Sequence, residues 1–90
     1  MKITLDISMY PLDADYKPPI KSFIRDLRGR DGIELVTSQM STQVRGEFDA
    51  VWDAVNACMK KAMREDGKVV FVSKCLNSDL DITRAPDIDS

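Results

Sequence analysis

The 90-residue chain contains no histidine, only two cysteines and only one tryptophan. The absence of histidine excludes the usual Ser-His-Asp and Cys-His catalytic arrangements, and two cysteines alone do not complete an ordinary structural zinc site. Its four glycines do not form a phosphate-binding loop. The remaining hydroxyls, carboxylates and aromatic rings are better suited to holding a small molecule than to breaking one, so we do not expect an enzyme.

Long apolar segments and a surplus of basic residues are also missing. The longest apolar run, Val69–Val72, is far shorter than the roughly 20 residues needed to cross a bilayer, and Asp6 lies where a signal peptide would be apolar. The net charge of −2 argues against a nucleic-acid partner. We therefore expect a cytoplasmic protein with one domain and neither a nucleic-acid nor a membrane partner.

Both cysteines lie among apolar neighbours, Cys58 in an expected helix and Cys75 in an expected strand. This setting is typical of small buried side chains in a reducing compartment. We expect neither a disulfide nor a reactive thiol.

Two strong periodic patterns occupy the first third of the chain. Apolar and polar residues alternate over residues 2–10, which predicts a β-strand that ends at Pro11. Pro18 and Pro19 then open a helix. Its apolar residues follow at i, i+3, i+4 and i+7, which predicts one buried stripe. They are Ile20, Phe23, Ile24 and Leu27.

Weaker patterns place the remaining elements. Two strands are expected over residues 33–40 and 41–46, and the sequence leaves open whether a turn or a bulge joins them. A second helix should run from Glu47 or Phe48 to Arg64, followed by a fourth strand over residues 68–76.

The resulting βαββαβ order predicts a ferredoxin-like α+β fold over residues 1–76, with two helices on one face of an antiparallel sheet. The fourth strand is apolar on both faces, since Val69 and Phe71 alternate with Val70 and Val72. A strand of this kind is normally covered on both sides. We therefore expect the open face to pack against another subunit in a homodimer or homotetramer.

Residues 77–90 form an acidic C-terminal tail with four aspartates and a few apolar residues. Two interpretations stay open: a solvated, frayed end, or a segment whose apolar residues dock on a neighbouring subunit. The spacing of the aspartates is not that of an EF-hand loop, so no calcium site is expected.

A hydroxyl-rich segment precedes the second helix, and it contains Ser38, Ser41 and Thr42. Such residues commonly satisfy nearby backbone groups. They also donate and accept hydrogen bonds, as an aminopyrimidine requires of its partners. Met40 could lie against a flat ring through its polarizable sulfur or fill a core.

Asp6 is the carboxylate with the least ordinary surroundings, because it lies in the middle of the first strand. It could pair with Arg45 or Lys74 across neighbouring strands. Alternatively, it could contact a ligand.

The residues Ile7–Leu12, Tyr16, Met40–Thr42 and Arg45-Gly46 together resemble the YkoF-like thiamin/hydroxymethylpyrimidine-binding family. The resemblance extends from Lys2 to about Cys75. It implies a ferredoxin-like fold whose domains pair through their sheets, and this chain would be the single-domain version. It also implies non-catalytic binding of thiamin or hydroxymethylpyrimidine in the cytoplasm, with no further cofactor and no metal.

Carried over to this sequence, the resemblance implies that the ligand is surrounded by Ser8, Tyr10, Met40, Ser41 and Thr42. Asp49 could serve as a carboxylate partner for the ligand or simply as a charge at a helix N-terminus. The family often has an Asn-Cys-Pro-Gly turn near the end of its last strand, where this chain reads Ser73-Lys74-Cys75-Leu76-Asn77.

Two other functions remain to be weighed. A structural or regulatory oligomerisation module without a ligand would use the same open sheet face, because one fold hosts many roles. A hydrolase or isomerase acting through Asp6 or Asp49 is disfavoured, since no base or oxyanion-stabilising group accompanies either carboxylate in the sequence.

Overall fold

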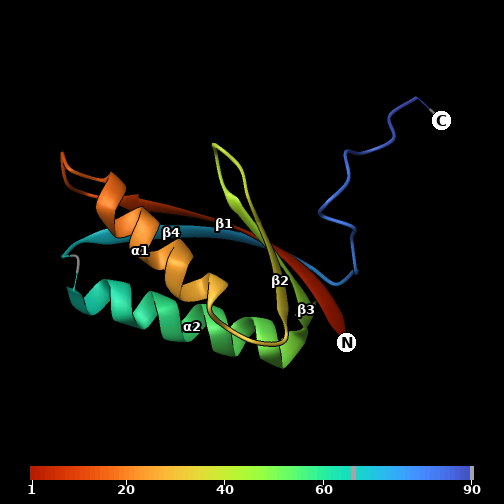
Figure 1. The fold of residues 1–90 in the computed structure, drawn as a ribbon, viewed down its shortest axis with the longest axis horizontal. Coiled ribbons are helices and arrows are strands. Elements are labelled where there is room, and N and C mark those ends of the chain that lie inside the picture. Colours follow the sequence, from red (N-terminus) through yellow and green to blue (C-terminus); the bar gives the residue numbers. More distant parts are fainter. Residues whose placement is uncertain (66, 90) are drawn as a thin grey trace.

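The computed structural model describes residues 1–65 and 67–89, and its elements follow the expected βαββαβ order. They are β1 (Lys2–Pro11), α1 (Lys17–Arg28), β2 (Ile33–Thr37), β3 (Thr42–Glu47), α2 (Phe48–Glu65) and β4 (Val69–Leu76). The antiparallel sheet has the order β2-β3-β1-β4. Both helices lie on one side of it, and the C-terminal segment lies on the other (Figure 1). The ferredoxin-like prediction is confirmed.

The core lies between the helices and the sheet face formed by the odd-numbered residues of β1. The strand register pairs Leu5 with Val44, and neither side chain is exposed. Phe23 and Leu27 of α1 are buried against this face, as their helical spacing predicts. The buried stripe of α2 consists of Val51, Ala54, Val55, Cys58 and Ala62.

Gly46 allows β3 to approach the start of β2 closely. A Cβ atom at this position would lie 2.9 Å from the backbone oxygen of Gly32. Such a contact requires one of the two backbones to move. A glycine at this position of β3 therefore allows the backbones of Gly46 and Gly32 to pack closely.

The hydroxyl-rich segment forms a turn, and β2 ends at Thr37 rather than at Met40 as expected. The backbone N–H of Ser38 donates to the carbonyl oxygen of Ser41 at 2.9 Å. The hydroxyl of Ser38 donates to the same oxygen at 3.1 Å. Because the serine satisfies local backbone groups, the chain leaves the β ladder early.

The two cysteines have different surroundings. Cys58 is buried, as expected, and burial raises the pKa of its thiol. Cys75 is exposed, so its expected burial was wrong. The reason is its position at the end of the edge strand β4, where residues 72–76 are all exposed.

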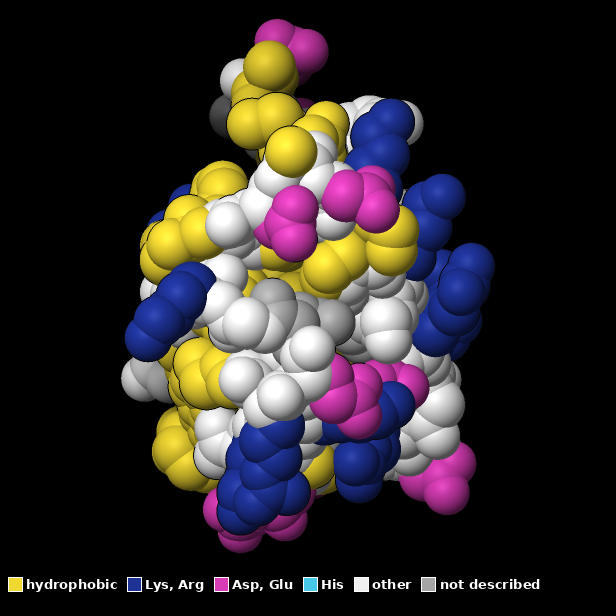
Figure 2. All heavy atoms as spheres, turned by 90° about the vertical axis from the view of Figure 1, so that its left-hand side faces the viewer, with side chains coloured by type: hydrophobic (Ala, Val, Ile, Leu, Met, Phe, Trp, Pro, Cys, Tyr) yellow, Lys and Arg dark blue, Asp and Glu magenta, His cyan; other side chains and the backbone are white. Residues whose placement is uncertain are grey.

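The described part of the chain contains no helix that is both long enough and apolar enough to cross a bilayer. Figure 2 shows the end of the molecule that lies on the left in Figure 1. Hydrophobic side chains gather along the left edge of this view and several basic side chains along its upper right edge, with acidic side chains between them.

Candidate functional site

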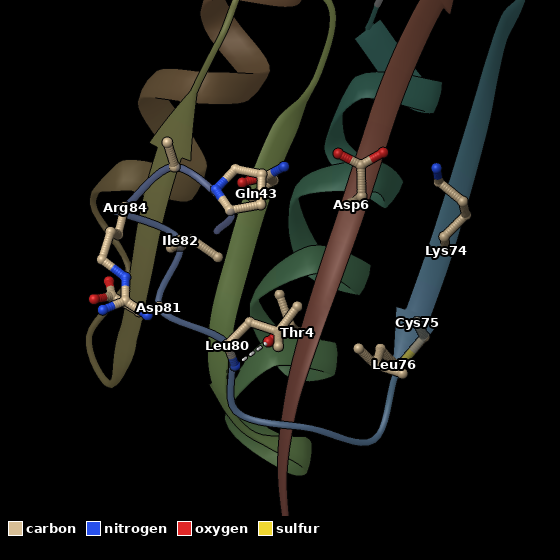
Figure 3. A pocket seen from close by; sticks show the side chains of 12 residues that line it. Thr4, Asp6, Gln43, Lys74, Cys75, Leu76, Leu80, Asp81, Ile82 and Arg84 are labelled. Atoms are coloured by element: carbon tan, nitrogen blue, oxygen red, sulfur yellow. Dashed lines mark hydrogen bonds between the residues drawn. The ribbon is translucent and has the colours of Figure 1, made fainter. Parts of the chain in front are cut away.

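The candidate site lies on the open face, which is the sheet surface opposite the helices. The even-numbered residues of β1 point to this side, since the odd-numbered ones form the core. The register places Asp6 between Gln43 of β3 and Lys74 of β4. Figure 3 shows Asp6 and Lys74 on the same side of neighbouring strands.

The C-terminal segment is attached to the open face through Thr4. The Thr4 hydroxyl donates to the carbonyl oxygen of Ser78 at 2.7 Å and accepts from the backbone N–H of Leu80 at 3.0 Å. Both interpretations of the tail were incomplete. Its first half is attached to the sheet of its own chain at Ser78 and Leu80, which neither interpretation included.

Arg45 holds the same segment from β3. Its Nε donates to Asp79 Oδ1 at 3.0 Å, and its Nη1 lies 3.8 Å from Asp81 Oδ1. Asp81 also accepts hydrogen bonds from the hydroxyl and the backbone N–H of Thr83, which lower the pKa of its carboxyl group. The segment is thus fixed at two adjacent strands.

Between the sheet and this segment lies a hollow of about 700 Å³, which we call the open-face hollow. Its floor contains polar groups of the sheet, and apolar side chains of the C-terminal segment line its wall (Figure 3). The volume falls within the roughly 300–1,000 Å³ of small-molecule sites. The floor comprises Thr4, Asp6, Gln43, Lys74, Cys75 and Leu76; the segment contributes Leu80, Asp81, Ile82, Arg84, Ala85 and Pro86.

Asp6 is half-buried and accepts a hydrogen bond from Ser41 Oγ at 2.7 Å through Oδ1. Neither expected ion pair, with Arg45 or with Lys74, is found among residues 1–65 and 67–89. Within the same residues, Oδ2 has no hydrogen-bond donor. Asp6 can therefore accept hydrogen bonds from an amino group or balance a cationic ligand in the hollow.

A second hollow of about 100 Å³ lies beside the turn between β2 and β3. Four of the expected site residues line it: Ser8, Met40, Ser41 and Thr42. Ser8 Oγ donates to the carbonyl oxygen of Met40 at 3.4 Å. The structure thus brings these four together, but the space is too small to enclose a ligand with two rings.

The same residues differ in accessibility. Thr42 is only 4% exposed, because its register partner Ile7 faces the helices and Thr42 lies beside it. Its hydroxyl lies 3.1 Å from that of Thr37. Met40, by contrast, is 85% exposed in the turn. Tyr10 is exposed on the open face, two residues beyond Ser8 and outside both hollows.

Asp49 lies apart from the other expected site residues. It is in the first turn of α2, whose Phe48 N–H donates to the carbonyl oxygen of Met1 at 2.9 Å. Ser8 lies six residues along β1 from Lys2, a distance of about 20 Å. The position of Asp49 fits a charge that stabilises a helix N-terminus.

Sequence reasoning did not identify Thr4, Gln43 or the segment 80–86 as parts of the site. Thr4 alternates with apolar neighbours on the same strand face as Asp6, and knowledge of the strand register would have placed Gln43 opposite Asp6. The segment 80–86 gives no local signal, because it contains neither a helix nor a strand. No group of three potential metal-ligating side chains occurs in the described part of the chain.

The family model described as YKOF-related Family matches residues 2–78, and no curated protein matches the chain. Among solved structures, a Streptococcus pneumoniae protein is 22% identical, with a TM-score of 0.81 over 89% of this chain and 90% of that one. A hypothetical protein of Methanocaldococcus jannascii is 21% identical, with a TM-score of 0.75 over 87% and 81% of the two chains. A proposed thiamine biosynthesis/salvage protein of Thermotoga maritima is 19% identical, with a TM-score of 0.75 over 96% and 90%. At these identities the likeness establishes a shared fold.

Proposed function

The chain belongs to the YKOF-related family, and from this premise we propose that it is a non-catalytic, cytoplasmic binding protein for thiamin or its hydroxymethylpyrimidine moiety. The observation that carries the proposal is Asp6 on the floor of the open-face hollow, with one carboxylate oxygen held by Ser41. The description of the Thermotoga maritima protein as a proposed thiamine biosynthesis/salvage protein supports the choice of ligand. Two free cysteines, one of them exposed, fit a reducing compartment.

The chemistry of the hollow suits an aminopyrimidine. The exocyclic amino group of such a ring can donate to Asp6, and the side-chain amide of Gln43 can both donate and accept. A thiazolium cation would be favoured by the same carboxylate. The apolar side chains of Leu80 and Ile82 offer contacts for the ring faces.

The residues that line the hollow support the proposal of binding without turnover. Of the two lining carboxylates, Asp81 is engaged by Thr83 and Arg45. Asp6 has a serine donor, but the lining residues offer no paired base for a nucleophile. We therefore assign Asp6 a binding role.

Saturating thiamin or hydroxymethylpyrimidine is expected to raise the midpoint of thermal unfolding. A ligand at about 100 times its dissociation constant adds roughly 2.7 kcal/mol, which corresponds to about 10 °C or more in a domain of this size. Differential scanning calorimetry would measure the shift, and isothermal titration would confirm binding. An analogue with a hydroxyl group in place of the pyrimidine amino group is the control. Equal shifts with both compounds, or no shift and no binding heat, would contradict the proposal.

A second candidate function is a structural or regulatory module that assembles through the open face without a ligand. The half of this face outside the open-face hollow carries exposed apolar side chains. They are Tyr10 at 52%, Val70 at 45% and Val72 at 53% exposure. Burying them in a homodimer or homotetramer would remove apolar surface from water. We propose this assembly for both candidate functions, and ligand binding distinguishes between them.

The substitution Val72→Lys is expected to reduce the solution mass to that of one chain, 10.1 kDa, because it places a charge within the apolar patch. Light scattering of the wild type should give at least twice that mass. Met63→Lys is the matched control, since Met63 is 50% exposed on α2. A monomeric wild type, or an unchanged mass for Val72→Lys, would exclude assembly through this patch.

A further inference from the structure

Thr4 is a polar residue buried by the C-terminal segment of its own chain. Only 7% of it is exposed, although it lies on the open face. Both bonds of its hydroxyl, to Ser78 and Leu80, are made with the backbone of a segment that contains no helix or strand. Since that backbone has no ladder of its own in this region, the two hydrogen bonds are a specific attachment to β1.

Arg45 provides a second attachment with a different physical character. Its ion pairs with Asp79 and Asp81 involve carboxylate side chains that are 37% and 49% exposed. Exposed ion pairs are weakened by water and salt. Thr4 should therefore hold the segment under all ionic conditions, whereas Arg45 contributes mainly at low salt.

Beyond these attachments, apolar side chains of the segment face the polar floor. Leu80 is 47% exposed and Ile82 is partly exposed, and both line the open-face hollow. Part of the apolar surface of these two side chains therefore remains accessible to a ligand in the hollow. Ile88 provides a contrast, because it is 82% exposed and lies outside the hollow.

From this arrangement, and resting on the proposed function, we infer that residues 80–86 form the wall that recognises the apolar faces of the ligand. Thr4 is the positioning residue that holds this wall over Asp6. The site then selects a flat, amphipathic amino-heterocycle, whose polar edge meets the floor and whose ring face meets the wall. A purely polar cation would use only the floor.

Four variants of the full chain distinguish the attachment of residues 80–86 to β1 from the contact of these residues with the ligand. Thr4→Val removes the hydroxyl, whereas Thr4→Ser retains it. Ile82→Ser removes an apolar side chain of the wall, and Ile88→Ser makes the same change outside the hollow. Isothermal titration with thiamin would measure the dissociation constant. Amide hydrogen exchange at Leu80 would report whether the wall is attached.

Thr4→Val is expected to weaken thiamin binding about fivefold or more and to accelerate exchange at Leu80 by a similar factor. Thr4→Ser should remain within about twofold of the wild type in both measurements. Ile82→Ser should weaken binding about fivefold or more while leaving Leu80 exchange unchanged, because it removes contact but not attachment. Ile88→Ser should change neither.

Two results would overturn the inference while leaving the proposed function intact. One is a wild type that binds thiamin with an affinity unaffected by Thr4→Val and Ile82→Ser. The other is Leu80 exchange as fast in the wild type as in an unstructured peptide. A wild type that binds neither thiamin nor hydroxymethylpyrimidine would instead overturn the proposed function, and the ligand-recognising wall with it.

Discussion

Replacing Leu5 by alanine is expected to lower the free energy of unfolding by about 2–5 kcal/mol. Leu5 has no exposed surface and lies at the centre of β1, between β3 and β4. Its shortening would leave a cavity among rigid neighbours, which include Val44. Because a 90-residue domain has a total stability of roughly 5–13 kcal/mol, this loss is a large fraction of the whole. Urea unfolding followed by far-ultraviolet circular dichroism would measure it.

Leu12→Ala provides the matched control for Leu5→Ala. The chemical change is identical, but Leu12 follows β1 and is 66% exposed. Its unfolding free energy should remain within about 0.5 kcal/mol of the wild type. If Leu5→Ala cost no more than Leu12→Ala, the helix-covered face of the sheet would not be the core of this protein.

The fold was predictable because its strongest signals are local. Alternation over residues 2–10 defines the buried face of β1 without any knowledge of its neighbours. The spacing of Phe23 and Leu27 does the same for α1. Once the order of the helices and strands is known, the right-handedness of the βαβ connections leaves few possible topologies for the sheet.

The assignment of faces in β3 was harder, because it depends on pairing across the sheet. The sequence gives no marker for where β2 ends and the turn begins, so Thr42 could not be assigned to a face. The observed pairing of Thr42 with Ile7 turns its side chain toward the helices. A shift of one residue would have exposed it on the open face instead.

The open-face hollow depends on contacts between residues far apart in the chain. Ser41 and Asp6 are 35 residues apart, and Thr4 and Ser78 are 74 apart. Neither contact has a periodic signature, because each joins a strand to an irregular segment. The family resemblance indicated a ligand, but none of the site residues it implied lines the open-face hollow, and four of them line the smaller hollow at the turn: Ser8, Met40, Ser41 and Thr42.

The substitution Asp6→Asn is expected to weaken thiamin binding by about 10- to 100-fold. Asparagine has nearly the same shape, and its side-chain oxygen can still accept the hydrogen bond from Ser41. Its amide N–H₂ would then replace Oδ2, so a donor would oppose the amino group of the pyrimidine. The negative charge that favours the thiazolium cation would also be lost. Isothermal titration at constant ionic strength would measure the change.

Two further variants determine whether the weaker thiamin binding of Asp6→Asn results from the lost contact between Asp6 and the ligand. Asp53→Asn makes the same chemical change on α2, outside the open-face hollow, and should leave the dissociation constant unchanged. Ser41→Ala retains the carboxylate but removes its donor, so it should cost less than Asp6→Asn, about fivefold. If Asp6→Asn bound thiamin as tightly as the wild type, Asp6 would not contact the ligand, and the proposed site on the floor of the open-face hollow would be wrong. An unchanged melting temperature of the ligand-free Asp6→Asn variant would show that the loss comes from binding, because the fold itself would then be intact.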